Sequence, residues 1–538
     1  MYSKSIFIFL IVGLLLLTKI NGEDINNYTG KCKNIYEYLE SQGKAANLQN
    51  CNVNKKGEVT GLYIYLHCLT NEQLKTILSY KTIKDLSLYT ITNLEYYSDD
   101  IISDYGCIDT PTNYEIISTL TNLETLYLEG ESNDNLYSNI PKSIELLQID
   151  SLNLNQKMVD AFSKLTNLNE LFMRDTEFSK DLDFSKFTNL KKLTDITLHY
   201  YSSPYIGNLF KYCKYVKSLN TYLVTFDEDT INTIGYLTNL EELTLGNSGF
   251  EDNVSFSSIK NLKNLTYLDI SCGSSNYHNN FSPNFFYLTK LKSFTLMNCG
   301  SKFSVAEDQS LTWANFKNLE YLQITDEDNY TMDDKKEIFD LSYLGDLTKL
   351  VEVFISNTGY SSIPESIGNL KNLEILNIPR NSIDSLPKSI GKLKKLRELI
   401  MYYNNLTSLP DEIGNLKNLE ILDFRLNNIN DIPETIGNLV NLRELSGGFN
   451  NITTIPTSIG NLTNLEELSF DNNKIVEIPK SIGNLINVTK LLFESNNIEV
   501  LPDVFGNMKN LDWIDFSYNK ITSIPPSLES LKIDYEFI

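Results

Sequence analysis

Side chains that could carry out catalysis are sparse in this sequence, and none forms a catalytic motif. The three histidines, His67, His199 and His278, are separated by long stretches of chain. There is no GxSxG, no HExxH, no Gly-rich phosphate loop and no CxxC pair. A glycosidase needs only two carboxylates, but nothing marks out any pair among the 69 Asp and Glu residues. We therefore expect a protein that is not an enzyme and that has no cofactor and no metal site.

The charge balance narrows the choice of partner. Lys and Arg number 46 against 69 acidic residues, which gives a formal net charge of −23. Binding to nucleic acid or to an anionic membrane needs a basic surface, so both are disfavoured.

Large side chains suited to protein recognition recur towards the C-terminal end. Tyr, Trp and Arg are frequent anchors of protein interfaces. We predict that five of these residues form one binding patch, because they fall on three successive repeats. The other two are better explained as ordinary surface, although they remain binding candidates. The predicted patch comprises Tyr402, Tyr403, Arg425, Leu426 and Phe449, and the two further candidates are Trp513 and Tyr518.

A repeat of 23 residues must position these side chains. Three independent columns of residues share this period, which chance cannot explain. They are the prolines from 364 to 525, the glycines from 368 to 506 and the asparagines from 381 to 519.

The segment from Leu373 to Lys395 serves as the reference repeat, with positions numbered 1 to 23. Apolar residues at positions 4 and 6 predict a short strand with one buried face, and those at 18 and 21 have helical spacing. Asn at position 9 is expected to satisfy buried backbone groups where the chain turns after the strand. Pro at position 15 and Gly at position 19 are interpreted as turn residues, because proline fixes φ and glycine permits tight turns. One repeat cannot bury its apolar side chains alone, so successive repeats must stack as coils of a solenoid.

The pattern LxxLxLxxNxIxxIPxxIGNLxNL resembles the leucine-rich repeat, and its 23-residue form resembles repeats of plant and Ras-group proteins. The resemblance implies an α/β solenoid curved like a horseshoe, with a parallel sheet on the concave face and short helical segments outside. Positions 2, 3, 5, 7 and 8 would then face the concave side. At position 9 the earlier repeats carry Thr176, Ser248, Cys299 and Thr358, with Glu131 and Glu327 as misfits.

The N-terminal segment is typical of a secretory signal peptide, because Lys4 precedes an apolar run from Ile6 to Leu17. This run is too short to span a membrane, and no second run is long enough. The entry CNVNKKGEVTGLYI resembles the start of plant-type leucine-rich repeat domains. We therefore predict a signal peptide (1–22), a cysteine-containing N-terminal cap (23–58), irregular repeats (59–349), and regular repeats with the C-terminal end (350–538).

Export would place the seven cysteines in an oxidising compartment. Four lie near the N-terminus and predict a disulfide-stapled cap, with three connectivities open: Cys32, Cys51, Cys68 and Cys107. A Cys272–Cys299 disulfide is an even alternative to a role for Cys299 at position 9. The odd total leaves at least one cysteine without an intramolecular partner.

Asn-x-Ser/Thr sequons make glycosylation a further expectation. Asn264 directly precedes a predicted strand, so glycan access to it is doubtful. The eight other candidates are Asn27, Asn253, Asn280, Asn329, Asn405, Asn451, Asn461 and Asn487.

These observations favour a secreted or cell-surface, non-catalytic protein that binds another protein through the concave sheet, and its acidity favours a basic partner. The alternative is binding of neutral glycans or cell walls, or inhibition of wall-degrading enzymes, as in some leucine-rich repeat inhibitors.

Overall fold

The computed structural model describes residues 28–90, 110–130, 133–201, 205–251, 254–273, 283–299, 311–326, 340–531 and 534–536. The chain divides into two compact units, Met1–Glu177 and Phe178–Ile538, and each is described by itself. In the part of the chain so described, no helix is both long and apolar enough to cross a membrane.

The first unit begins with a helix and an antiparallel strand pair, and then repeats strand and helix. Strand β1 pairs antiparallel with β2, whereas β2 to β6 pair in parallel, each with the next. Its helices are α2 (Gly30–Ser41), η2 (Ala45–Asn47), α3 (Asn71–Ile77), η4 (Glu115–Thr119), α5 (Asp134–Ser138) and α6 (Gln156–Phe162), where η denotes a 3₁₀ helix. Its strands are β1 (Leu48–Val53), β2 (Val59–Tyr65), β3 (Asp85–Tyr89), β4 (Thr125–Glu129), β5 (Leu146–Asp150) and β6 (Glu170–Arg174).

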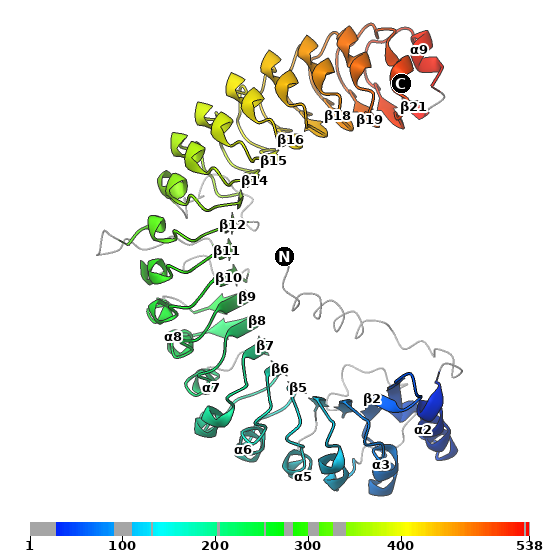
Figure 1. The fold of residues 1–538 in the computed structure, drawn as a ribbon, viewed down its shortest axis with the longest axis vertical. Coiled ribbons are helices and arrows are strands. Elements are labelled where there is room, and N and C mark those ends of the chain that lie inside the picture. Colours follow the sequence, from blue (N-terminus) through cyan, green and yellow to red (C-terminus); the bar gives the residue numbers. More distant parts are fainter. Residues whose placement is uncertain are drawn as a thin grey trace. The chain divides into compact units, whose positions relative to one another are not determined.

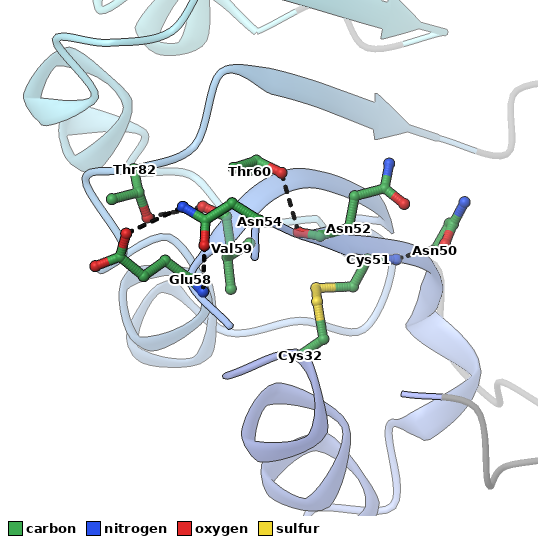
Figure 2. Close-up of a disulfide and its surroundings, with 9 residues drawn as sticks. All are labelled: Cys32, Asn50, Cys51, Asn52, Asn54, Glu58, Val59, Thr60 and Thr82. Carbon is green, nitrogen blue, oxygen red and sulfur yellow. Dashed lines mark hydrogen bonds between the residues drawn. A yellow bond between two sulfur atoms is a disulfide. The ribbon is translucent and has the colours of Figure 1, made fainter. Parts of the chain in front are cut away.

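A disulfide between Cys32 and Cys51 joins helix α2 to strand β1 (Figure 2). The turn into β2 is held by Asn54, whose side chain accepts a hydrogen bond from the backbone N–H of Glu58 and donates one to its carboxylate. Cys68 is also disulfide-bonded, and Cys107 lies outside the described residues. Of the open connectivities, the structure therefore selects one that contains Cys32–Cys51.

The second unit is a run of parallel strands, each joined to the next by a short helix or loop. Figure 1 shows that within this unit the strands line the inner side of an arc and the helices line its outer side. Its less regular part contains η5 (Ser185–Asn189), β7 (Asp195–Tyr201), α7 (Gly207–Phe210), β8 (Ser218–Phe226), α8 (Glu228–Ile234), β9 (Glu242–Phe250), η6 (Ile259–Asn261), β10 (Tyr267–Cys272), η7 (Pro283–Tyr287), β11 (Ser293–Met297), η8 (Trp313–Asn315), β12 (Tyr321–Thr325), η10 (Leu341–Asp346) and β13 (Glu352–Ser356).

The regular part of this unit follows the 23-residue period. It contains η11 (Glu365–Asn369), β14 (Ile375–Asn377), η12 (Lys388–Lys392), β15 (Glu398–Ile400), η13 (Asp411–Asn415), β16 (Ile421–Asp423), η14 (Glu434–Asn438), β17 (Glu444–Ser446), η15 (Thr457–Asn461), β18 (Glu467–Ser469), η16 (Lys480–Asn484), β19 (Lys490–Leu492), η17 (Phe505–Asn507), β20 (Trp513–Asp515), α9 (Pro526–Glu529) and β21 (Asp534–Glu536). Strand β21 pairs in parallel with β20, so the C-terminal segment adds a final strand.

Each regular coil buries the apolar positions that the sequence predicts. In the coil of β16 the position 4 and 6 residues Leu422 and Phe424 are fully buried, as are Ile436 and Leu439 at positions 18 and 21. The spacing of three between the last two suits a 3₁₀ helix, which has three residues per turn. Pro433 caps that helix with φ −68°, close to the value that its ring imposes.

Glycine at position 19 has a different role from the one predicted. These glycines have no positive φ, so they are not needed for tight turns. A Cβ added to Gly414 would lie 2.4 Å from the carbonyl oxygen of Thr435 in the next coil. Glycine is therefore required because successive 3₁₀ helices pack backbone against backbone.

The asparagine ladder at position 9 is confirmed. The side chain of Asn427 is buried, and its Nδ2 donates to the carbonyls of Phe424 and Met401, the latter in the preceding coil. Its Oδ1 accepts from the N–H of Leu406, 2.9 Å away. In the first coil of the ladder Thr358 substitutes for asparagine and donates to Oδ1 of Asn381. Glu131 and Glu327, the expected misfits, lie outside the described residues.

Two cysteines of adjacent coils are joined in the second unit. Cys272, at the end of β10, forms a disulfide with Cys299, just after β11, and both residues are buried. The structure therefore selects the Cys272–Cys299 disulfide, which the sequence left as an even alternative to a role for Cys299 at position 9. The thiol of Cys213 is free and buried, as the odd cysteine count requires.

The 40-residue step between Ile83 and Leu123 is longer than the 23-residue period, which is consistent with an insertion or a lost strand. Strand β3 pairs directly with β4, so the sheet has no strand between them.

Candidate functional site

Three large residues of the predicted patch occupy the same position in successive coils. Tyr403, Leu426 and Phe449 stand at position 8, just after strands β15, β16 and β17, and these strands are paired in sequence order. Their exposed fractions are 47%, 41% and 50%. Neighbouring strands are ~4.8 Å apart, so the three residues form a continuous row.

The backbone at position 8 is in the left-handed region, with φ of 58°, 55° and 56° for these three residues. Here the chain leaves the strand, and the N–H of Phe449 donates to the carbonyl of Asp471 in the next coil. A non-glycine residue in this region costs roughly 1 kcal/mol, and Asn tolerates it best. The next coil has Asn472 at position 8, with φ 53°. Every regular coil is left-handed at position 8, and bulky exposed side chains occupy this position in the three successive coils of the row and again at Tyr518.

The position 7 residues Tyr402 and Arg425 complete the patch, which we call the aromatic patch (Tyr402, Tyr403, Arg425, Leu426 and Phe449). Nε and Nη2 of Arg425 donate to the two carboxylate oxygens of Asp423 at 2.9 and 2.6 Å. These bonds raise the pKa of Arg425 above its ordinary value. The guanidinium carbon lies 5.9 Å from the ring centre of Tyr402, within cation–π range. The arginine is thus fixed in place and its charge is compensated.

The structure does not bring Trp513 and Tyr518 into this patch. Both are exposed, at 39% and 70%, but they belong to the coil of β20. The coils of β18 and β19 lie between that coil and Phe449.

An open groove of about 1020 Å³ runs along positions 23 and 2 of the regular coils. Four of its eight charged residues are paired with each other: Arg397 with Glu420, and Arg443 with Glu466, each through two hydrogen bonds. No aromatic side chain lines it, so it offers no stacking surface for a sugar ring. Among the described surfaces, the aromatic patch is therefore the better candidate for recognition.

The four described sequon residues in the prediction lie in the regular coils. Asn405 and Asn461 are exposed, and Asn451 is half-buried; Asn405 and Asn451 stand at position 10, two residues beyond Tyr403 and Phe449. Asn487 is exposed but lines the groove, and its Nδ2 donates to the carbonyl of Thr463 at 2.8 Å. The other four, which lie outside the described residues, are Asn27, Asn253, Asn280 and Asn329.

A polar cluster in the first unit was missed by sequence reasoning. The hydroxyl of Tyr127 donates to carboxylate oxygens of Glu129, at 2.7 Å, and Asp150, at 3.0 Å, and Arg174 forms an ion pair with Asp150. Burial raises the pKa of Glu129 above its ordinary value. These residues come from positions 5 and 7 of β4, β5 and β6. Applying the strand alternation to the irregular repeats would have revealed the cluster. Arg174 compensates part of the negative charge of this cluster. The hydrogen bonds within the cluster explain it as a structural network.

Comparisons with known proteins agree with this architecture. Residues 328–406 and 395–473 match a family model described as a leucine-rich repeat region, and residues 464–485 and 510–531 match the leucine-rich repeat model. A search of curated proteins by sequence finds no match.

Several solved structures share the fold. A leucine-rich repeat protein of Leptospira interrogans aligns with a TM-score of 0.55 and 24% identity over 87% of this chain and 100% of its own. The receptor kinase ectodomain GASSHO1/SCHENGEN3 of Arabidopsis thaliana, in complex with CASPARIAN STRIP INTEGRITY FACTOR 2, aligns with a TM-score of 0.58 and 23% identity over 89% of this chain and 54% of its own. The Toll–Spatzle complex of Drosophila gives a TM-score of 0.59 and 17% identity over 91% of this chain and 67% of its own. The chain thus spans about half the length of the plant receptor structure.

Proposed function

Because the chain is a leucine-rich repeat protein, we propose that it is a secreted, non-catalytic protein that binds another protein through the inner sheet face of its second unit, with the aromatic patch as the main contact. The observation that carries this proposal is the row of Tyr403, Leu426 and Phe449, which are exposed and adjacent on paired coils.

Two further facts support binding of a protein. Aromatic residues and arginine are enriched at the centres of interfaces, where a few of them supply most of the affinity. Two proteins of the same fold, the plant receptor and Toll, have been solved as complexes. Secretion is supported by the apolar N-terminal run and by the disulfides, which persist in oxidising compartments.

The test uses substitution by asparagine, the residue that stands at this position in the next coil. The partner is first identified by affinity capture from secreted material, and its Kd is then measured for the wild type and for the Tyr403→Asn, Phe449→Asn double variant. We expect a loss of more than ~2 kcal/mol in binding. The melting temperature should hold or rise, because asparagine relieves the left-handed strain.

Tyr518→Asn is the matched control, since it makes the same change at position 8 outside the patch. It should leave the Kd unchanged. Full binding by the double variant would remove the patch from the site. If a glycan array showed a neutral glycan that binds the wild type but not the double variant, carbohydrate binding would replace protein binding as the function.

Export has its own test. The secreted protein should begin near Glu23 when its N-terminus is sequenced. A mature product that still carries Met1 would contradict secretion without bearing on the patch.

A further inference from the structure

The apolar row of the aromatic patch ends at a carboxylate. Phe449 is its last member, and the next coil presents Asp471 at position 7, half-buried after strand β18. Asp471 accepts hydrogen bonds from the hydroxyl of Ser469, at 2.6 Å, and from Nδ2 of Asn472, at 3.2 Å. Among the described side chains it has no lysine or arginine as an ion-pair partner.

Gly448 determines where this carboxylate lies. A Cβ on Gly448 would be 2.5 Å from Oδ1 of Asp471, so the carboxylate occupies the space that a side chain would fill. It therefore leans over the coil that carries Phe449, the last ring of the patch. Gly448 has no positive φ, so backbone conformation does not explain the glycine.

The two charged groups at the patch, Arg425 and Asp471, differ in what they can still bind. In the middle coil of the patch, the guanidinium of Arg425 is held by both carboxylate oxygens of Asp423 and faces the ring of Tyr402. An acidic ligand would have to compete with the carboxylate of Asp423 for this guanidinium. Asp471, one coil beyond Phe449, interacts electrostatically with Arg425 but forms no ion pair with it, and a carboxylate near an aromatic residue suits an ammonium or guanidinium group. The protein's net charge of −23 also favours a cationic ligand.

We propose that Asp471 binds a lysine or arginine side chain of the protein partner, close in sequence to the apolar side chains that pack on Tyr403, Leu426 and Phe449. This rests on the proposed function and specifies the partner's chemistry. One coil step of ~4.8 Å corresponds to roughly one and a half residues of an extended chain. The basic residue therefore lies one to three positions from the last apolar anchor. The basic end of the bound segment lies towards the coil of β18, and its apolar end lies towards the coil of β15.

The experiment uses a phage-displayed library of random dodecapeptides, selected in parallel on the wild type, Asp471→Asn and Asp471→Lys. Wild-type pools should be enriched in Lys or Arg one to three positions from Phe, Tyr, Trp or Leu. The Asp471→Asn pool should lose that preference, and the Asp471→Lys pool should exchange it for Asp or Glu. A synthetic peptide from the wild-type pool should bind Asp471→Asn about threefold to fivefold more weakly, as expected for one exposed charge pair.

Two variants keep the interpretation specific. Asp512→Asn removes one exposed negative charge from the coil of β20, outside the patch, without creating a glycosylation sequon, and should select the same peptides as the wild type. Gly448→Ala fills the space of the Asp471 carboxylate and should weaken the basic preference while the apolar preference remains.

The outcomes separate this inference from the proposed function. Apolar peptides that depend on Tyr403 and Phe449 but show no basic preference would overturn the role of Asp471 alone. A basic preference that persists in Asp471→Lys would do the same, because it must come from another carboxylate. A library that yields no peptides dependent on the patch would overturn both proposals.

Discussion

Replacement of one ladder asparagine tests whether position 9 supports the solenoid. In Asn427→Ala the side chain loses three donated bonds, to the carbonyls of Met401, Phe424 and Arg425, and one accepted bond, from the N–H of Leu406. The three carbonyls keep other donors. They are Asn404 Nδ2 for Met401, Asn450 Nδ2 for Phe424 and the N–H of Tyr403 for Arg425.

The N–H of Leu406 has no such substitute and would remain buried without a partner. An unsatisfied buried donor costs about 1–3 kcal/mol, so we expect the free energy of unfolding to fall by that amount. The assay is urea unfolding of the full chain, together with hydrogen exchange of the Leu406 amide. Asn428→Ala, at the neighbouring exposed position, is the control and should change stability by less than ~0.5 kcal/mol.

Asn427→Asp sharpens the test because it keeps the acceptor but replaces the donor. Near neutral pH its carboxylate would face three carbonyl oxygens, so it should be less stable than the alanine variant. It should recover partly in acid, where a protonated carboxyl can donate one bond. An unchanged urea midpoint with full protection of the Leu406 amide in Asn427→Ala would refute the assignment of this ladder.

Three further predictions concern packing, pH and covalent bonds. Gly391→Ala places a Cβ 2.5 Å from the carbonyl oxygen of Glu412, so the urea midpoint should report a loss of about 1–3 kcal/mol; a neutral result would show that the helices can separate. Burial raises the folded pKa of Glu129 above its ordinary 4.5, so its protonated form contributes stability at low pH that is lost as pH rises through the folded pKa. Melting curves should therefore show Glu129→Gln more stable than the wild type near pH 7, by about 1.4 kcal/mol per pKa unit, with the gain vanishing in acid; a gain independent of pH would contradict this. Replacing both Cys272 and Cys299 with serine should lower the free energy of unfolding by about 2–4 kcal/mol relative to the oxidised wild type and leave it equal to that of the reduced wild type. An equal loss relative to both forms of the wild type would attribute the effect to packing rather than to the disulfide.

Residues on the inner sheet face can vary because other residues of each coil maintain the fold. Leu422 and Phe424 at positions 4 and 6 hold the core, and Asn427 holds the turn. Arg425 and Leu426, which lie between these buried residues in the sequence, are exposed and contribute little to the core. Recognition residues can therefore change from coil to coil without loss of the fold, which is why partner chemistry has to be derived from the side chains themselves.

The sequence by itself determined the repeat, the strand positions, the buried apolar columns and the asparagine ladder. These follow from local periodicity, because each coil must bury the same positions against identical neighbours. Tertiary structure alone decided the reason for Gly414, the pairing of Cys272 with Cys299 and the direct pairing of β3 with β4. It also decided that the carboxylate of Asp471 lies over Gly448 and that Tyr127 bridges Glu129 and Asp150. These depend on distances between coils, which no pattern within one coil contains.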